Sequence, residues 1–132
     1  MMEDRYLFRG KRIDNGEWVE GYLSYPFCTK KGNESYYFYA KDSLGFFCRC
    51  VVDASTICQC TGLKDKNGKL IWENDIVKIN NSKVNTVITF RDFEIICTIP
   101  NEKYYKHRLE YDTEYEVIGN KFDNPELLES EE

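Results

Sequence analysis

Two Cys-x-Cys pairs are the residues of this sequence best suited to hold a metal ion: Cys48, Cys50, Cys58 and Cys60. Residues two apart on a strand face the same way, so two neighbouring strands would bring all four thiols together. Four thiolates are a ligand set of structural Zn²⁺. However, zinc knuckles use Cys-x-x-Cys, and the side chains of an extended Cys-x-Cys lie about 7 Å apart. We therefore favour the alternative, small apolar side chains packed in a core, and predict no cofactor.

Other residue types offer little support for catalysis. His107 is the single histidine, and it lies between Lys106 and Arg108 with no nucleophile motif in the sequence. The segment Gly62–Lys69 resembles a phosphate-binding loop only superficially, because Leu70 stands where a Ser or Thr would hold magnesium. A carboxylate pair assembled from scattered acids stays open, but no pair stands out. We therefore name no catalytic residue.

A lysine-rich turn is the candidate interaction surface. Asn-Gly is a strong hairpin signal because both residue types tolerate positive φ. Lysines beside an exposed aromatic ring could bind a phosphate backbone or an acidic protein patch. The alternative is a solvated turn with the Trp buried, which we favour. The candidate residues are Lys64, Lys66, Asn67, Lys69 and Trp72.

The clearest two-residue periodicity runs from Leu109 to Val117, where apolar or Thr positions alternate with acids. This pattern predicts a half-buried strand with one acidic face. Such a face could bind a cation or a basic partner, although more often it is simply solvated and discourages edge-to-edge pairing. We favour the solvated alternative. The acids are Glu110, Asp112, Glu114 and Glu116.

The elements that would position these residues are short strands between polar turns. Tyr6–Arg12 and Glu17–Tyr25 flank Asn15-Gly16 and predict a hairpin. Pro26 is expected to end the second strand, and Thr29–Ser35 is expected to be a polar loop. Further strands are predicted at 36–40, 46–52, 57–61, 70–72, 76–79, 84–90 and 93–99, with a loop at 101–108. Asn124-Pro125-Glu126 predicts a short helical turn that docks Leu127 and Leu128.

Composition supports a β protein. Aromatic residues make up 15% of the 132 residues, with ten Tyr and eight Phe, and large rings favour strands. No long 3.6-residue pattern occurs, so we predict an all-β fold, a sandwich or small barrel. The net charge is −5 without a strong basic cluster, so nucleic-acid binding is an alternative that we do not favour.

The beginning of the chain predicts its location. Met1–Arg5 has no apolar stretch of a signal peptide, and no apolar run approaches the ~18 residues that cross a bilayer. We therefore expect a cytoplasmic protein without a membrane partner. Its six cysteines are then expected to be thiols.

Residues 61–77, TGLKDKNGKLIWENDIV, resemble the central motif of the YopX family, small proteins carried by phages and prophages. Three further segments resemble that family: FRGKRIDNGEWVEGYL at 8–23, VDASTICQ at 52–59 and EVIGNKFDNPELL at 116–128. Asn74 stands where the family usually has Gly, and Asn is the next-best residue for a left-handed turn. Cys58 and Cys60 replace a small residue and an aromatic residue, which speaks against a family zinc site.

The resemblance implies an irregular N-terminal β subdomain, residues 1–60, and an SH3-like small barrel, residues 61–132, with one short C-terminal helical turn. It implies a phage or prophage setting and brings no reaction, so no catalytic residue is carried over. We predict a non-catalytic protein-interaction module whose partner is a phage or host protein. A nucleic-acid-binding barrel and an enzyme without a local sequence signature are the alternatives, and self-association stays open.

Overall fold

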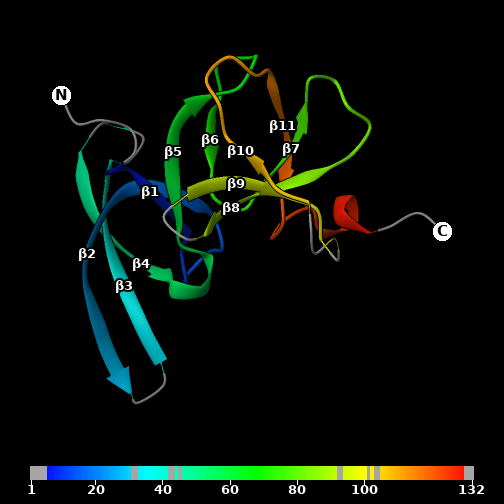
Figure 1. Ribbon diagram of the computed structural model, residues 1–132. Helices are drawn as coiled ribbons and strands as arrows, with labels where there is room; N and C mark the ends of the chain where they lie inside the picture. Colours follow the sequence, from blue (N-terminus) through cyan, green and yellow to red (C-terminus); the bar gives the residue numbers. More distant parts are fainter. Residues whose placement is uncertain are drawn as a thin grey trace. The chain divides into compact units, whose positions relative to one another are not determined.

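The computed structural model describes residues 6–30, 33–41, 44, 46–91, 94–100, 102 and 105–129, and their side chains except at 23–30, 33–37, 41, 47 and 48. Within those residues the chain forms antiparallel strands and two short 3₁₀ turns (Figure 1). The predicted all-β fold is confirmed. The strands are β1 Phe8–Lys11, β2 Trp18–Lys30, β3 Asn33–Lys41, β4 Phe47–Asp53, β5 Cys58–Lys64, β6 Leu70–Trp72, β7 Asp75–Ile79, β8 Thr86–Arg91, β9 Glu94–Thr98, β10 His107–Arg108 and β11 Tyr115–Asn120. The turns are η2 Ala54–Thr56 and η3 Pro125–Leu128.

The chain divides into two compact units, Met1–Cys60 (unit 1) and Thr61–Glu132 (unit 2). Strand β5 passes through the boundary, because its first residues pair with β1 and its later residues lead to β6. Among the described residues, no helix is both long and apolar enough to span a bilayer.

Unit 1 is a curled sheet with the strand order β4-β3-β2-β1-β5. The end of β1 also meets β4, because Arg12 bridges to Val52 and the Ile13 amide donates to the Val51 carbonyl at 3.1 Å. Pairing therefore runs through β1, β2, β3 and β4 and back to the end of β1. Gly10 leaves room for this contact between β1 and β4. A Cβ at Gly10 would lie 3.3 Å from the Val52 Cβ, which is closer than side chains usually pack. The enclosed side chains are Phe38, Ala40, Cys50 and Val52.

The predicted end of the second strand at Pro26 is wrong. Strand β2 continues to Lys30, and β3 begins at Asn33, inside the predicted polar loop. The ladder of β2 with β3 shifts register between Leu23 and Pro26. Strand β1 pairs with β2 only as far as Gly21, so the missing N–H of Pro26 disrupts no ladder on that side. A proline at such an irregular edge position is tolerated in a strand.

Unit 2 contains a second sheet with the strand order β10-β9-β8-β7-β11. Its core consists of Ile71, Val77, Ile88, Cys97 and Tyr115. Asn74 has a φ of 71°, as predicted for a left-handed turn position. The short C-terminal helical turn is confirmed as η3, although the Asn124 side chain accepts from the Asn120 amide at 3.2 Å instead of capping η3.

The prediction of one strand over Leu109–Val117 is wrong. Strand β11 begins at Tyr115, and Tyr111, on the preceding loop, is 92% exposed. Two amides of this segment bond to side chains instead of a ladder: the Glu110 amide donates to the Tyr115 hydroxyl at 3.0 Å and the Glu114 amide to Asn80 Oδ1 at 3.1 Å. The four acids therefore do not share one strand face. A short strand, β10, also lies within the predicted loop 101–108.

Candidate binding surfaces

The lysine-rich turn is built around Asp65. The Asp65 amide donates to the Lys69 carbonyl at 2.7 Å and the Gly68 amide to the Asp65 carbonyl at 3.0 Å. The Asp65 carboxylate accepts from the amides of Asn67, Lys69 and Val117 at 2.9, 2.9 and 3.0 Å. Burial raises the pKa of Asp65, but these bonds outweigh burial and hold the pKa below its ordinary value. The Asp65 carboxylate thus stabilises the turn.

Trp72 does not belong to the candidate surface around this turn. Trp72 is 3% exposed, so the interpretation of an exposed ring beside the lysines is wrong and the buried alternative is confirmed. Lys64, Asn67 and Lys69 are exposed. Lys66 is also exposed, and its Nζ lies 3.4 Å from a Glu116 carboxylate oxygen. What remains is a solvated basic turn, and the exposed ring that lines a pocket with Lys64 is Tyr111 rather than Trp72.

The cysteine pairs do not lie on neighbouring strands, contrary to the premise of the zinc hypothesis. Strand β4 carries the first pair and β5 the second, with β3, β2 and β1 between them in the sheet. Cys50, Cys58 and Cys60 are buried, and the Cys58 thiol donates to the Thr56 carbonyl at 3.2 Å. The Cys48 side chain lies outside the described residues. In the described part, no three side chains of metal-binding type come together.

One group of side chains in unit 2 was not anticipated from the sequence. Cys97 on β9 pairs in register with His107 on β10, and His107 Nε2 lies 3.1 Å from the Tyr115 hydroxyl. Burial raises the pKa of Cys97 to about 11, so at neutral pH this residue is a thiol rather than a nucleophilic thiolate. Burial also raises the pKa of Tyr115. The group therefore fits packing and hydrogen bonding better than catalysis.

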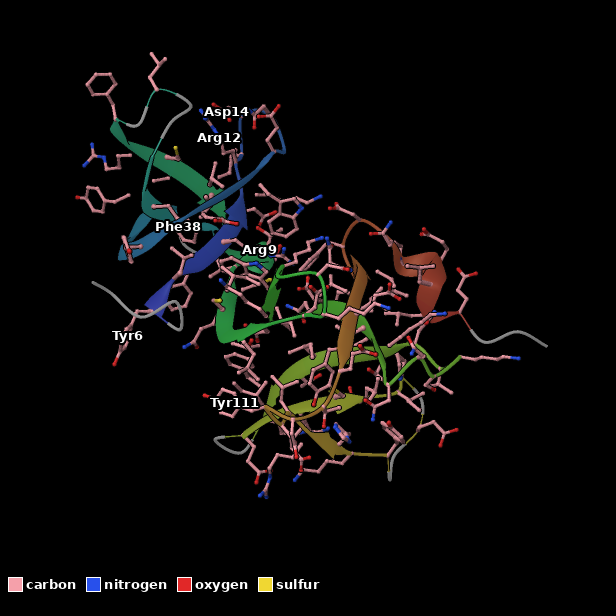
Figure 2. All side chains as sticks on the ribbon, turned by 90° about the horizontal axis from the view of Figure 1, so that it is seen from above. Tyr6, Arg9, Arg12, Asp14, Phe38 and Tyr111 are labelled. Atoms are coloured by element: carbon pink, nitrogen blue, oxygen red, sulfur yellow. The ribbon has the colours of Figure 1, made fainter. Side chains whose placement is uncertain are left out.

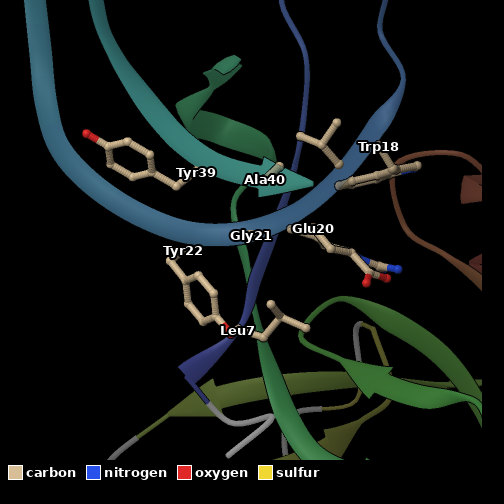
Figure 3. Close-up of a pocket in the computed structure, with 9 residues that line it drawn as sticks. Leu7, Trp18, Glu20, Gly21, Tyr22, Tyr39 and Ala40 are labelled. Carbon is tan, nitrogen blue, oxygen red and sulfur yellow. The ribbon is translucent and has the colours of Figure 1, made fainter. Parts of the chain in front are cut away.

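A groove in unit 1 offers a different surface (Figure 3). Its volume is about 670 Å³. Trp18 and Glu20 lie at one end of the stretch of β2 that lines the groove, and the rings of Tyr22 and Tyr39 lie at the other end (Figure 3). The lining residues are Leu7, Arg9, Trp18, Val19, Glu20, Gly21, Tyr22, Tyr39 and Ala40.

Cations lie on the Trp18 ring. The Arg9 guanidinium carbon lies 4.7 Å and the Lys11 Nζ 5.3 Å from the ring centroid. Cations at this distance from an indole are attracted by its electron-rich face. Two basic side chains thus lie beside the Trp18 ring, and of these Arg9 also lines the groove.

Strand register explains why these side chains gather. Residues directly opposite each other in a ladder share a face of the sheet. The pairs Lys11–Trp18, Arg9–Glu20, Tyr22–Tyr39 and Tyr39–Arg49 are in register, while their neighbours in the strands form the buried face. We call this set the aromatic face: Arg9, Lys11, Trp18, Glu20, Tyr22, Tyr39 and Arg49.

Gly21 allows a close approach of β2 and β3. A Cβ at this buried position would lie 2.3 Å from the Tyr39 carbonyl oxygen and 3.1 Å from the Ala40 Cα. Strands β2 and β3 therefore approach each other more closely than any side chain at 21 would permit.

The sequence contained a signal for this face. The predicted hairpin around Asn15-Gly16 has basic residues at 9 and 11 on one arm and Trp18, Glu20 and Tyr22 at alternate positions on the other. An antiparallel register places such alternate positions on one face. The contribution of Tyr39 required the pairing of β2 with β3, which residue types alone do not give.

Comparison with known proteins adds the family and the fold. A family model described as YopX protein matches residues 7–129, which confirms the resemblance. The chain is also similar to a crystal structure of the protein yopX from Bacillus subtilis, with 23% identity and a TM-score of 0.53. That match covers 95% of this chain and 99% of the other. At this identity the likeness shows the fold alone. No protein with curated annotation matches.

Proposed function

This chain belongs to the YopX family, and from that premise we propose that it is a non-catalytic module that binds another protein. A phage or prophage setting and a cytoplasmic location, both expected from the sequence, are part of this proposal. The partner is a phage or host protein. The irregular unit 1 supplies the binding surface, and an SH3-like barrel in unit 2 supplies a stable support.

The observation that carries the proposal is the aromatic face. Trp, Tyr and Arg are the residue types that dominate binding energy at protein interfaces, and this face combines Trp18, Tyr22, Tyr39 and Arg9 around one groove. Tyr39 is 47% exposed, so its ring can be covered by a partner without a change in the core. Large amphipathic rings supply contact area at a low cost in conformational entropy.

The basic turn of unit 2 supports the alternative, nucleic-acid binding, less well. Lys64 and Lys69 are exposed, but stacking of bases needs an aromatic ring next to the cations. Trp72 cannot provide that ring because it is buried, and the exposed Tyr111, which lines a pocket with Lys64, stands between the acids Glu110 and Asp112. Salt-dependent retention on single-stranded DNA that disappears in the triple variant Lys64→Ala, Lys66→Ala, Lys69→Ala would favour this alternative.

The test is capture of partners from infected or induced host cells with the tagged full-length protein, followed by mass spectrometry. Wild type is compared with Tyr39→Ser on the aromatic face and Tyr111→Ser in unit 2, two matched changes at exposed rings (47% and 92%). We expect one protein to be retained by wild type and Tyr111→Ser and to fall about tenfold with Tyr39→Ser. The purified partner should then reproduce this order with wild type and both variants.

Three outcomes would count against the proposal. Retention of the same partner by Tyr39→Ser would remove the aromatic face from the interaction. Loss with Tyr111→Ser but not with Tyr39→Ser would transfer the interaction to unit 2. Recovery of no protein under several induction conditions would oppose a binding role altogether.

A further inference from the structure

Another pocket, which we call the η3 pocket, lies in unit 2 beside the C-terminal turn. Its volume is about 570 Å³, and η3 is the short red coil in Figure 1. The apolar residues that line it come from the segments next to β8 and β9 and from η3: Val84, Ile99, Leu127 and Leu128. Val84 is 47% exposed, so part of this apolar lining is open to a ligand.

Asn85, which also lines the η3 pocket, carries an unused hydrogen-bond acceptor. Its Nδ2 donates to the Leu127 carbonyl oxygen at 2.8 Å. This bond fixes the orientation of the amide, because an oxygen in place of Nδ2 could not donate to a carbonyl. In the described part of the chain, the Asn85 Oδ1 is buried and has no hydrogen-bond partner. A buried acceptor without a donor costs free energy, and such atoms are uncommon in native folds.

The bond between Asn85 and Leu127 indicates which ligand would satisfy Oδ1. A side-chain amide carries a donor and an acceptor side by side, and an extended residue presents its own N–H and C=O on one side of the chain. In η3 the Leu127 carbonyl meets Nδ2, but the Leu127 N–H turns away and donates to the Asn124 carbonyl at 3.1 Å. An extended residue at this place would bond to both atoms of the amide.

A weak attachment allows η3 to give way to such a residue. None of the four residues of η3 is buried. Among the hydrogen bonds of the described residues, the bond from Asn85 is the one that joins η3 to a distant part of unit 2. A single short helical turn has little stability of its own. Because Oδ1 is closed to solvent while η3 is in place, a donor reaches it when η3 moves.

The rim of the η3 pocket is acidic. Glu126 and Glu129 line it and are exposed, and neither carboxylate forms an ion pair with a described residue. In the sequence two more acids follow, Glu131 and Glu132. Of the described residues that line the pocket, Lys83 alone is basic. Complementary charge therefore favours a segment with basic residues.

We propose that the η3 pocket binds an extended basic segment of another protein through Asn85. One residue of this segment donates its N–H to Oδ1 and accepts from Nδ2 in place of the Leu127 carbonyl. Its apolar side chain packs on Val84 and Ile99, and its basic neighbours lie close to the acids of the displaced η3. This site belongs to unit 2 and does not rest on the proposed function, so either can fail alone.

Labelled seven-residue peptides test the inference with the full-length protein. The parent peptide is Lys-Lys-Ser-Leu-Ser-Lys-Lys, in which the single Leu sets the register. Two others carry an N-methyl group, one on the Leu nitrogen and one on the nitrogen of the following Ser. Fluorescence anisotropy gives the affinities. Methylation of Leu should weaken binding about tenfold, because it removes the donor for Oδ1. Methylation of Ser should weaken it less than about twofold, because neighbouring N–H groups of an extended chain point in opposite directions.

A peptide with Glu in place of every Lys tests the acidic rim. It should bind most weakly, and its difference from the parent peptide should shrink as salt rises. The double variant Glu126→Gln, Glu129→Gln should weaken the parent peptide about fivefold. The matched control is Glu110→Gln, Glu114→Gln, which changes the net charge equally at exposed acids outside the lining of this pocket. This control should weaken binding less than about twofold.

Asn85→Ala locates the peptide bond at the amide. It should weaken the parent peptide about tenfold and bring the effect of Leu methylation close to zero, since the two changes remove the same contact. Hydrogen exchange reports the movement of η3. The amides of Leu127 and Glu129 donate to the carbonyls of Asn124 and Glu126 at 3.1 and 3.3 Å, and both should exchange faster when the peptide is bound.

Several results would overturn the inference. Equal binding of the parent and Leu-methylated peptides by wild type would remove the bond to Oδ1, and this result does not depend on the folding of any variant. Equal weakening by the two double variants would reduce the preference to net charge. Slower exchange at Leu127 and Glu129 would mean that η3 stays in place. No binding at millimolar peptide would mean that Asn85 recognises no such segment, whatever partner the aromatic face retains.

Discussion

In unit 2, buried polar side chains bond to the backbone of the same unit. The Asp75 carboxylate accepts from the Trp72 amide at 2.8 Å, and the Thr61 hydroxyl donates to the Ile71 carbonyl at 2.8 Å. The Thr86 hydroxyl donates to the Val77 carbonyl at 3.0 Å. In unit 1, an open groove is lined by members of the aromatic face: Arg9, Trp18, Glu20, Tyr22 and Tyr39. The groove with the half-exposed ring of Tyr39 directs the search for binding to unit 1.

The largest expected effect tests the core beneath the aromatic face. Phe38 is fully buried in unit 1 (Figure 2), and Phe38→Ala should lower the free energy of unfolding by about 3–5 kcal/mol, because it removes apolar burial and leaves a cavity. Urea unfolding can be followed through Trp18 in a Trp72→Phe background, since each unit holds one of the two Trp residues. A loss below about 1 kcal/mol would mean that the β1–β4 closure does not depend on this ring.

A change at Asp65 tests the internal bonds of unit 2. Asp65→Asn keeps one acceptor oxygen but removes the charge that receives three backbone amides, so we expect a loss of about 2 kcal/mol at pH 7. Asp53→Asn in unit 1 is the control, because the Asp53 carboxylate is exposed and bonds only locally to Ser55. The control should cost about 1 kcal/mol or less. Equal losses of unfolding free energy in the two variants would mean that Asp65 contributes no more to the stability of unit 2 than Asp53 contributes to that of unit 1.

The same variant has a defined pH dependence. The pKa of Asp65 is lower in the folded chain than its ordinary value of 3.8, so ionised Asp65 stabilises the fold above that value. This stabilisation is lost as pH falls through the lower, folded pKa. The difference in unfolding free energy between wild type and Asp65→Asn should therefore be constant from neutral pH down to about 5 and narrow below about 4. Urea titrations at each pH measure it, and a difference that widens on acidification would contradict the sign of the shift.

A smaller effect is expected at Tyr115, which ties the loop before β11 to the core of unit 2. Its hydroxyl accepts from the Glu110 amide at 3.0 Å and contacts His107 Nε2 at 3.1 Å. Tyr115→Phe should lower the free energy of unfolding by about 1 kcal/mol, because the Glu110 amide loses its acceptor while the ring still packs. Hydrogen exchange of the Glu110 amide should become faster. Unchanged exchange at Glu110 would show that the hydroxyl does not hold this loop.

Features that depend on neighbouring residues could be predicted from the sequence, whereas features that depend on contacts between distant residues could not. Turns are local, so the hairpins at Asn15-Gly16 and Asn67-Gly68 and the left-handed Asn74 were predictable from residue types. The strand predicted over Leu109–Val117 failed although its alternation is the clearest in the chain. The loop amides there bond to Asn80 and Tyr115 side chains, and no two-residue period reports such partners.

The candidate surfaces likewise combine local features that residue types predict with contacts that residue types do not predict. The lysines around Asn67-Gly68 were placed correctly on a turn, but the burial of Trp72 is a property of the folded chain that its residue type does not give. The register of β1 with β2 was accessible from the hairpin, whereas the approach of β3 at Gly21 was not, because it is a contact between Gly21 and the Tyr39 carbonyl. Pro26 misled the prediction because a register shift there admits proline.

The smallest effect is expected where the two units are most alike. Gly16 in unit 1 and Gly68 in unit 2 each end an Asn-Gly turn, with φ of 72° and 79° and no atom within 4 Å of an added Cβ. The preceding Asn residues do not share the positive φ, so each turn demands one left-handed residue rather than two. Gly16→Ala and Gly68→Ala should therefore each cost about 1 kcal/mol in unfolding free energy, since only the left-handed strain of a Cβ is involved. Thermal and urea unfolding of the two variants measure this cost.

Because the local geometry is the same, a difference above about 0.5 kcal/mol between the two variants would come from the surroundings of the turns. A larger loss at Gly68 would mean that the bonds from Asp65 make the turn of unit 2 less able to relax than that of unit 1.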